Sequence, residues 1–404
     1  MKRQFSAGQK HIAWMMSAAL AMNGALLTGC EASSKAPETP EEFHAAMVDR
    51  SVVQLGNTCR LNAIMDRAEQ GEDITIGYIG GSITEGYSAG AQSPDCYASL
   101  SAAAFQTTYL KGGTVTCQNN GLSGTPSVLG NLRASTELLA TDPDIILIEF
   151  AVNDGGDYQY IVAYESLVRA CLAQENQPAV ILLFTYMENG HTCQENQQKI
   201  GEHYDLGMIS VRDALVPELE SGRMTWDTYS DDDVHPNIAG HALLAEYIAR
   251  YFEKASAKKA ETSYTIPAET LEPKLYENAA LLDASNLKFK DGAWAVRTTN
   301  SHFPAGFTYQ RDMENAPLAF TVKTKELFIV YQKASSTDYG MLGVYVNGKL
   351  EGIVNGFGSN AWGGPAVDLV YESDTVQELQ VELKMLEDHT EKQFEILAIG
   401  VTGS

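Results

Sequence analysis

Short apolar runs alternate with amphipathic segments along residues 41–251. Short, mostly apolar runs of this kind are typical of strands buried on both faces of a parallel sheet. They lie at 74–80, 145–150, 179–184 and 208–211, and helical segments lie between or beside them at 60–69, 164–173 and 238–252. The alternation predicts an α/β fold, a three-layer sandwich in which helices cover both faces of a mainly parallel sheet.

The pattern changes in the last third of the chain. A charged, Ala-rich stretch ends at Pro267, and strand-like segments then follow at regular spacing. Asn347-Gly348 between two of them is a strong signal for a two-residue hairpin. We therefore expect an all-β sandwich of jelly-roll type. The predicted boundaries are 41–254 for the α/β domain, 255–269 for a linker and 270–404 for the β-sandwich.

The N-terminus has the features of an export signal. Residues 1–29 contain three basic residues and no acidic one, and an apolar stretch at 12–27 ends in Leu-Leu-Thr-Gly-Cys30. This ending resembles the bacterial lipobox, in which the cysteine is lipidated. A transmembrane anchor is the alternative, but the stretch is short of the ~20 residues needed to span. We expect a signal peptide at 1–29, a polar tether at 30–40 and attachment to a membrane of the cell envelope through lipidated Cys30.

Charge and cysteine usage narrow the function further. The chain has 28 Lys and Arg against 52 Asp and Glu, a net charge of -24, so it lacks the basic face that nucleic-acid binding needs. Five cysteines remain besides Cys30, and none forms a Cys-x-x-Cys pair. His191 and Cys193 lack further ligands nearby in the sequence, so no metal site is predicted. Disulfide pairing and oligomeric state stay open.

Four short motifs lie at predicted strand ends, in a Gly-containing loop, or before the last helix. They are Gly80-Gly81-Ser82-Ile83-Thr84, Asn119-Asn120-Gly121-Leu122-Ser123-Gly124, Asn153-Asp154 and Asp232-Asp233-Val234-His235. Together they resemble the SGNH/GDSL hydrolase family, which is named for a Ser, a Gly, an Asn and a His in this order. Gly-Gly-Ser-Ile replaces the common Gly-Asp-Ser-Leu, a variant similar to bacterial carbohydrate esterases.

The resemblance implies a role for each of these residues. Ser82 is the nucleophile, which is weak until a base removes its proton. His235 is that base, and Asp232, three residues earlier, fixes the imidazole tautomer. The Ser82 N–H, the Gly124 N–H and the Asn153 side-chain amide form the oxyanion hole. This mechanism needs no cofactor.

Other nearby residues have less specific interpretations. Gly86-Tyr87-Ser88-Ala89-Gly90 matches the α/β-hydrolase elbow, but the preceding strand has already ended at Gly80. Glu85 and Tyr87 follow the nucleophile and are as consistent with substrate contact as with a helix N-terminus. Asp231 and Asp233 are expected to be exposed, His241 to be structural or solvated, and Asp154 to be a hydrogen-bonding turn residue. Trp294, Trp362 and Tyr339 can stack on sugars or pack in the β core.

The leading hypothesis is an exported serine esterase that removes small acyl groups, chiefly O-acetyl, from a carbohydrate. Its expected partners are the acylated carbohydrate and a membrane. A lipase, phospholipase or thioesterase of the same family is one alternative. A glycan-binding surface lipoprotein with a decayed catalytic domain is another, although the complete Ser, Gly, Asn and His set argues against decay. The sequence selects neither the sugar polymer nor the acetylated position.

Overall fold

The computed structural model describes residues 36–259 and 261–403. The predicted signal peptide, Cys30 and most of the predicted tether lie outside this part of the chain. The described residues from Val48 onward belong to one compact unit, and those up to Met47 belong to another. Among the described residues, no helix has the length and apolar character that crossing a membrane requires.

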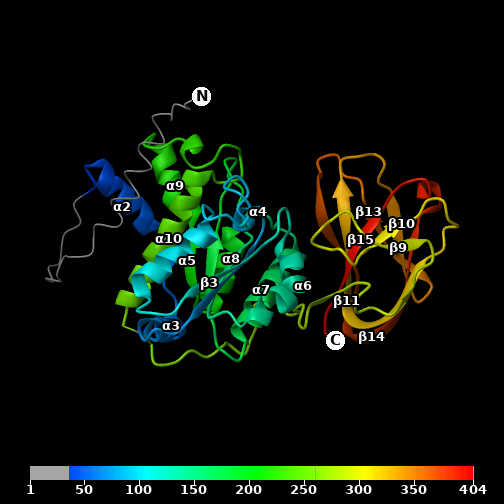
Figure 1. Ribbon diagram of the computed structural model, residues 1–404, viewed down its shortest axis with the longest axis horizontal. Coiled ribbons are helices and arrows are strands. Elements are labelled where there is room, and N and C mark those ends of the chain that lie inside the picture. Colours follow the sequence, from blue (N-terminus) through cyan, green and yellow to red (C-terminus); the bar gives the residue numbers. More distant parts are fainter. Residues whose placement is uncertain (1–35, 260, 404) are drawn as a thin grey trace. The chain divides into compact units, whose positions relative to one another are not determined.

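A six-stranded sheet forms the centre of the first half of the chain (Figure 1). Its order is β1 (Val52–Gln54), β6 (Gly207–Ser210), β5 (Ala179–Phe184), β4 (Ile145–Glu149), β2 (Ile74–Gly80) and β3 (Val115–Gly121). The pairings from β3 through β6 are parallel, and among the described strands of this sheet only the edge strand β1 pairs antiparallel. The mainly parallel sheet is therefore confirmed.

Helices cover both faces of this sheet and complete the three layers. On one side α6 (Ser127–Glu137), α7 (Tyr158–Leu172) and α8 (Gln194–His203) pack together, and α7 and α8 bury apolar side chains against β4 and β5. On the other side α3 (Cys59–Glu69), α5 (Tyr97–Tyr109) and α10 (Ile238–Ala257) pack together. The remaining helices are α2 (Pro40–Arg50), α4 (Ser82–Glu85) and α9 (Val211–Glu220), with short 3-10 turns at Leu139–Thr141, Trp226–Thr228 and Glu387–His389.

Strand β3 is one of the elements that the hydrophobic pattern did not indicate. Its sequence, Val-Thr-Cys-Gln-Asn-Asn-Gly, is largely polar, and its side chains are mostly only half-buried. It lies at the edge of the sheet and pairs with β2 alone. An edge strand does not need the uninterrupted apolar run of a central parallel strand, so the sequence lacked the usual signal.

The second half of the chain is all-β, as predicted. Its strands are β7 (Ala280–Leu282), β8 (Phe289–Lys290), β9 (Trp294–Val296), β10 (Phe307–Tyr309), β11 (Leu318–Ala334), β12 (Met341–Val346), β13 (Lys349–Asn355), β14 (Trp362–Met385) and β15 (Glu395–Val401). All their pairings are antiparallel. Register shifts interrupt the long β11–β14 ladder, and such bulges bend strands.

The predicted hairpin turn is also present. Val346 pairs with Lys349, so Asn347 and Gly348 make the two-residue connection between β12 and β13. Both have positive φ, 53° for Asn347 and 81° for Gly348. This is the conformation of a type I′ turn, which Asn-Gly adopts at little cost because glycine has no Cβ and asparagine tolerates the left-handed region.

The two halves share a buried apolar cluster. It joins Leu129 and Leu132 of α6 with Phe328 of β11 and Leu397 of β15. The Asn131 side chain, also on α6, donates to the Tyr276 carbonyl at 3.0 Å. The β half is thus fixed to the helix that directly follows the Gly124 loop.

Candidate active site

Ser82 lies at the carboxyl end of the central strand β2, where helix α4 begins. Parallel sheets place their sites at this edge. The turn requires glycine because other groups approach very closely. A Cβ atom on Gly80 would lie 2.1 Å from Thr84 Oγ1, and one on Gly81 would lie 2.1 Å from Asn153 Oδ1. Gly81, which directly precedes Ser82, therefore lies against the Asn153 side chain, and Ser82 itself is 6% exposed.

His235 and Asp232 complete a hydrogen-bonded chain that begins at Ser82. Ser82 Oγ lies 3.0 Å from His235 Nε2, and His235 Nδ1 lies 2.8 Å from Asp232 Oδ2. The other Asp232 oxygen accepts from the backbone N–H groups of Val234 at 2.7 Å and His235 at 2.6 Å. Asp232 therefore shapes its own loop as well as orienting the imidazole.

The electrostatics of this loop keep Asp232 ionised. Partial burial on its own would raise the pKa of Asp232, but the hydrogen bonds from His235 and Val234 outweigh burial and leave the pKa below its usual value. Asp231 instead accepts a hydrogen bond from the Asn237 side chain at 3.0 Å. Of the three consecutive aspartates, Asp232 is the one in contact with the imidazole.

Three separate segments carry the predicted oxyanion donors, at Ser82, Gly124 and Asn153. Gly124 lies in the loop between β3 and α6, with a φ of +70° that favours glycine. Asn153 follows β4, and its backbone N–H donates to the Phe150 carbonyl at 3.0 Å. The Asn153 Oδ1 atom has no hydrogen-bond partner among the described residues. The arrangement is suited to acyl transfer, in which a serine attacks a carbonyl and negative charge develops on its oxygen.

A buried carboxylate beneath the nucleophile was not singled out from the sequence. Glu149, the last residue of β4, is fully buried and accepts from Thr84 Oγ1 at 2.9 Å and Thr185 Oγ1 at 2.6 Å. Burial raises its pKa, and these hydrogen bonds oppose the rise. Glu149 thus anchors α4 to the sheet. The sequence did contain a signal for this residue, because Glu149 is a single acidic residue at the end of an otherwise apolar strand.

Tyr87 and His241 support the other side of the imidazole. The Tyr87 ring centre lies 4.2 Å from that of His235. The Tyr87 carbonyl lies 3.3 Å from His241 Nε2, and His241 Nδ1 accepts from the Tyr97 N–H at 3.1 Å. Burial lowers the pKa of His241 to about 4, so this imidazole is neutral near pH 7. His241 is buried and structural, whereas the sequence had left a structural and a solvated position open.

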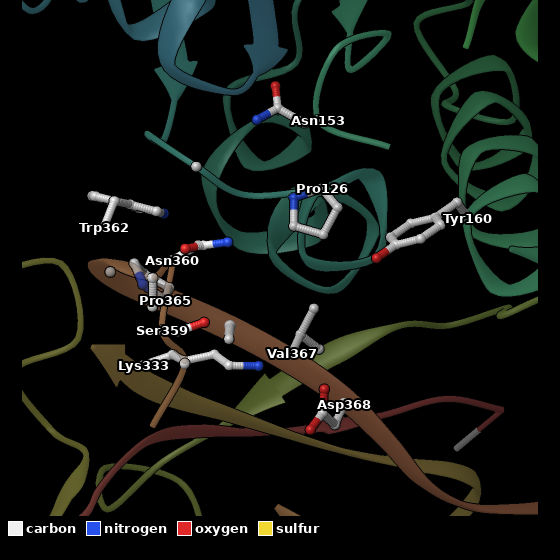
Figure 2. A pocket seen from close by; sticks show the side chains of 15 residues that line it. Pro126, Asn153, Tyr160, Lys333, Ser359, Asn360, Trp362, Pro365, Val367 and Asp368 are labelled. Carbon is white, nitrogen blue, oxygen red and sulfur yellow. The ribbon is translucent and has the colours of Figure 1, made fainter. Parts of the chain in front are cut away.

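A pocket of about 490 Å³ lies between Gly124 and Asn153 of the first half and residues of the β half (Figure 2). Gly124, Asn153 and Tyr160 line it from the first half of the chain. Trp362 lines it from the β half, is 61% exposed, and approaches so closely that a Cβ on Gly124 would lie 2.2 Å from its ring. The remaining lining residues are Pro126, Lys333, Gly358, Ser359, Asn360, Ala361, Gly364, Pro365, Ala366, Val367 and Asp368.

The candidate aromatic residues of the β half divide clearly. Trp294 is 1% exposed and belongs to the β core, whereas Trp362 faces the pocket.

The described part of the chain has free thiols at Cys59, Cys96, Cys117, Cys171 and Cys193. Across residues 36–259 and 261–403, the structure contains no cluster of His, Cys, Asp and Glu arranged to hold a metal ion. His191 contacts the Asp154 carbonyl instead.

Residues 78–243 match the family model described as GDSL-like Lipase/Acylhydrolase family. This part of the chain is a GDSL-like acylhydrolase domain. The match includes Ser82, Gly124, Asn153, Asp232 and His235.

Solved structures resemble both halves of the chain. A two-domain esterase (CEX) active on acetylated mannans is 28% identical, with a TM-score of 0.80, covering 88% of this chain and 98% of that one. The same esterase co-crystallized with mannopentaose is 27% identical, with a TM-score of 0.79, covering 88% of this chain and 97% of that one. None of the curated proteins matches the sequence. The resemblance to CEX therefore extends over the acylhydrolase domain and the β half together.

Proposed function

We propose that this GDSL-like acylhydrolase is a serine esterase that removes O-acetyl groups from a carbohydrate. The observation that carries the proposal is the hydrogen-bonded chain from Ser82 through His235 to Asp232, with Asn153 packed against Gly81, the residue before Ser82. A domain that only binds glycan does not need these hydrogen bonds, so their presence argues against a decayed catalytic domain.

The chemistry follows from the contacts. Ser82 Oγ attacks the acetyl carbonyl carbon while its proton passes to His235 Nε2. The Asp232 carboxylate stabilises the imidazolium, and the N–H donors of Ser82, Gly124 and Asn153 stabilise the oxyanion. The intermediate collapses, the sugar hydroxyl leaves with the proton from His235, and Ser82 carries the acetyl group. Water, deprotonated by His235, then attacks the acetyl-serine and releases acetate.

The pocket supports a carbohydrate as the alcohol part of the ester. The exposed Trp362 ring offers a flat apolar face for a sugar, and Asn360, Ser359 and Asp368 offer hydrogen-bonding groups. The related CEX esterase is active on acetylated mannans, and the likeness covers the β half that supplies Trp362. We infer that an acetylated polysaccharide, with acetylated mannan as the first candidate, lies in this pocket with its acetyl ester at Ser82.

Acetate release over a panel of acetylated mannan, xylan, pectin and peptidoglycan tests the function directly. We expect release from at least one polymer, with mannan foremost, and faster turnover of p-nitrophenyl acetate than of p-nitrophenyl octanoate. Preference for octanoate would favour a lipase instead. Absence of turnover on every ester would contradict the proposed esterase.

Replacing Trp362 should affect the polymer more than a small ester. Trp362→Ala removes the stacking face, so we expect kcat/KM on the polymer to fall roughly 2- to 10-fold further than on p-nitrophenyl acetate, since aromatic contacts contribute about 0.5–1.5 kcal/mol. Tyr158→Ala is the matched control, because Tyr158 is 52% exposed and is not among the pocket residues. An equal loss on both substrates would argue against polymer binding at Trp362.

A further inference from the structure

The three predicted oxyanion donors lie in segments that are far apart in the sequence. The covalent chain between them is therefore too long to fix their spacing. Ser82 begins α4, Gly124 lies between β3 and α6, and Asn153 follows β4. A catalytic constellation must be held within about 0.5 Å of its productive geometry by supporting contacts. Gly124 is the most demanding of the three, because its donor is a backbone N–H on a loop.

Glu85 holds the loop on the side that precedes Gly124. It lies at the end of the short helix that begins with Ser82. Its Oε2 atom accepts a hydrogen bond from the Ser123 N–H at 2.9 Å and a second from the Ser123 hydroxyl. Ser123 directly precedes Gly124. The segment that carries the nucleophile therefore holds the loop that carries the second donor.

Asp154 holds the same loop on the side that follows Gly124. It comes directly after Asn153, and its Oδ1 accepts from the Ser127 N–H at 2.8 Å. Its Oδ2 accepts from the Gln197 side chain at 3.0 Å. Asp154 is 3% exposed and Gln197 2% exposed, so both groups are removed from solvent. The segment that carries Asn153 therefore holds the other end of the Gly124 loop.

We propose that Glu85 and Asp154 are positioning residues for the esterase reaction, which together hold the Gly124 loop so that its N–H and the donors of Ser82 and Asn153 converge on one oxyanion. This inference rests on the proposed function. The inference assigns a role to two carboxyl groups whose hydrogen bonds go to the Gly124 loop and to Gln197 rather than to Ser82 or His235. Burial raises the pKa of Asp154 to about 7, against the hydrogen bonds from Ser127 and Gln197, so keeping this carboxyl buried is costly.

A second buried carboxylate in the same half supplies a matched control. Glu165 is fully buried and also holds backbone N–H groups of a loop, those of Leu271 and Glu272, each at 2.8 Å. It resembles Asp154 in burial and in its contacts, but its loop carries none of the oxyanion donors. Its replacement reports what losing a buried loop-holding carboxylate does to folding alone.

Steady-state kinetics on p-nitrophenyl acetate test the proposal. Asp154→Ala and Glu85→Ala should each lower kcat by roughly 10- to 100-fold with KM within about twofold, since a displaced donor weakens only the transition state. Glu165→Ala should lower the unfolding temperature but keep kcat within about twofold. Glu85 is half-buried, so its variant keeps the test open if Asp154→Ala does not fold.

Conservative variants separate positioning from charge. Asp154→Asn and Glu85→Gln keep an oxygen that accepts from Ser127 or Ser123, so we expect most of kcat to return. At position 154 the new amide NH2 group can donate to Gln197 Oε1, which has no partner among the described residues.

Inhibition by trifluoroacetone provides a second measurement, because its adduct with Ser82 places an oxyanion in the same hole. The inhibition should weaken in the alanine variants by a factor that follows the loss of kcat.

Three outcomes would overturn the inference. They are kcat near the wild-type value in both alanine variants, a loss of kcat in Glu165→Ala equal to theirs, and unchanged trifluoroacetone inhibition. A wild-type protein without activity on p-nitrophenyl acetate would instead contradict the proposed function, so the two failures are distinguishable.

Discussion

Ser82→Ala should lower kcat on p-nitrophenyl acetate by roughly 10,000-fold or more while leaving the fold intact. The variant removes the atom that forms the acyl-enzyme. It removes only one hydroxyl from a helix start where alanine is well tolerated, so the unfolding temperature should stay close to that of the wild type. His235→Ala should cause a similar loss, because Ser82 is a weak nucleophile without its base.

The double variant makes this prediction sharper. Residues that act as a unit are not additive, so Ser82→Ala combined with His235→Ala should be barely slower than either single variant. Ser88→Ala is the control, since Ser88 is the serine of the competing elbow motif. Substantial activity in Ser82→Ala, or a large loss in Ser88→Ala, would refute the assignment of the nucleophile.

Asp232→Asn should have the second-largest effect, up to ~10,000-fold in kcat. Asp232 Oδ2 accepts from His235 Nδ1, whereas an amide can present an N–H there and favour the wrong tautomer. The substitution keeps the size of the side chain. It also keeps one oxygen that can accept from the backbone N–H groups of Val234 and His235, so the loop should persist.

Asp231→Asn and Asp233→Asn provide neighbouring controls for this variant. Asp231 contacts Asn237, and neither Asp231 nor Asp233 is the partner of the His235 imidazole. Each should keep kcat within a few-fold of the wild-type value, measured on p-nitrophenyl acetate at the same pH. If either variant were slower than Asp232→Asn, the role of Asp232 would be wrong.

The sequence by itself determined the features that depend on local pattern. Short apolar runs such as Ile74–Gly80 predicted the buried parallel strands, because a strand buried on both faces is mostly apolar. Asn347-Gly348 predicted its hairpin, because few other pairs accept two positive φ values. The spacing of Asp232 and His235 placed the carboxylate beside the imidazole, because three residues are enough for the chain to turn back.

Only the tertiary structure decided what depends on contacts between distant segments. Trp294 and Trp362 look alike in the sequence, but one packs in the β core and the other lines the pocket. The polar strand β3 is held by its pairing with β2 at the edge of the sheet. Asp154 looked like a turn residue until the fold brought it to the Ser127 N–H. A hydrogen bond between residues far apart in the sequence leaves no periodic pattern in either segment. Each segment forms its own secondary structure from its local pattern of apolar and polar residues, so that pattern does not reveal the distant partner.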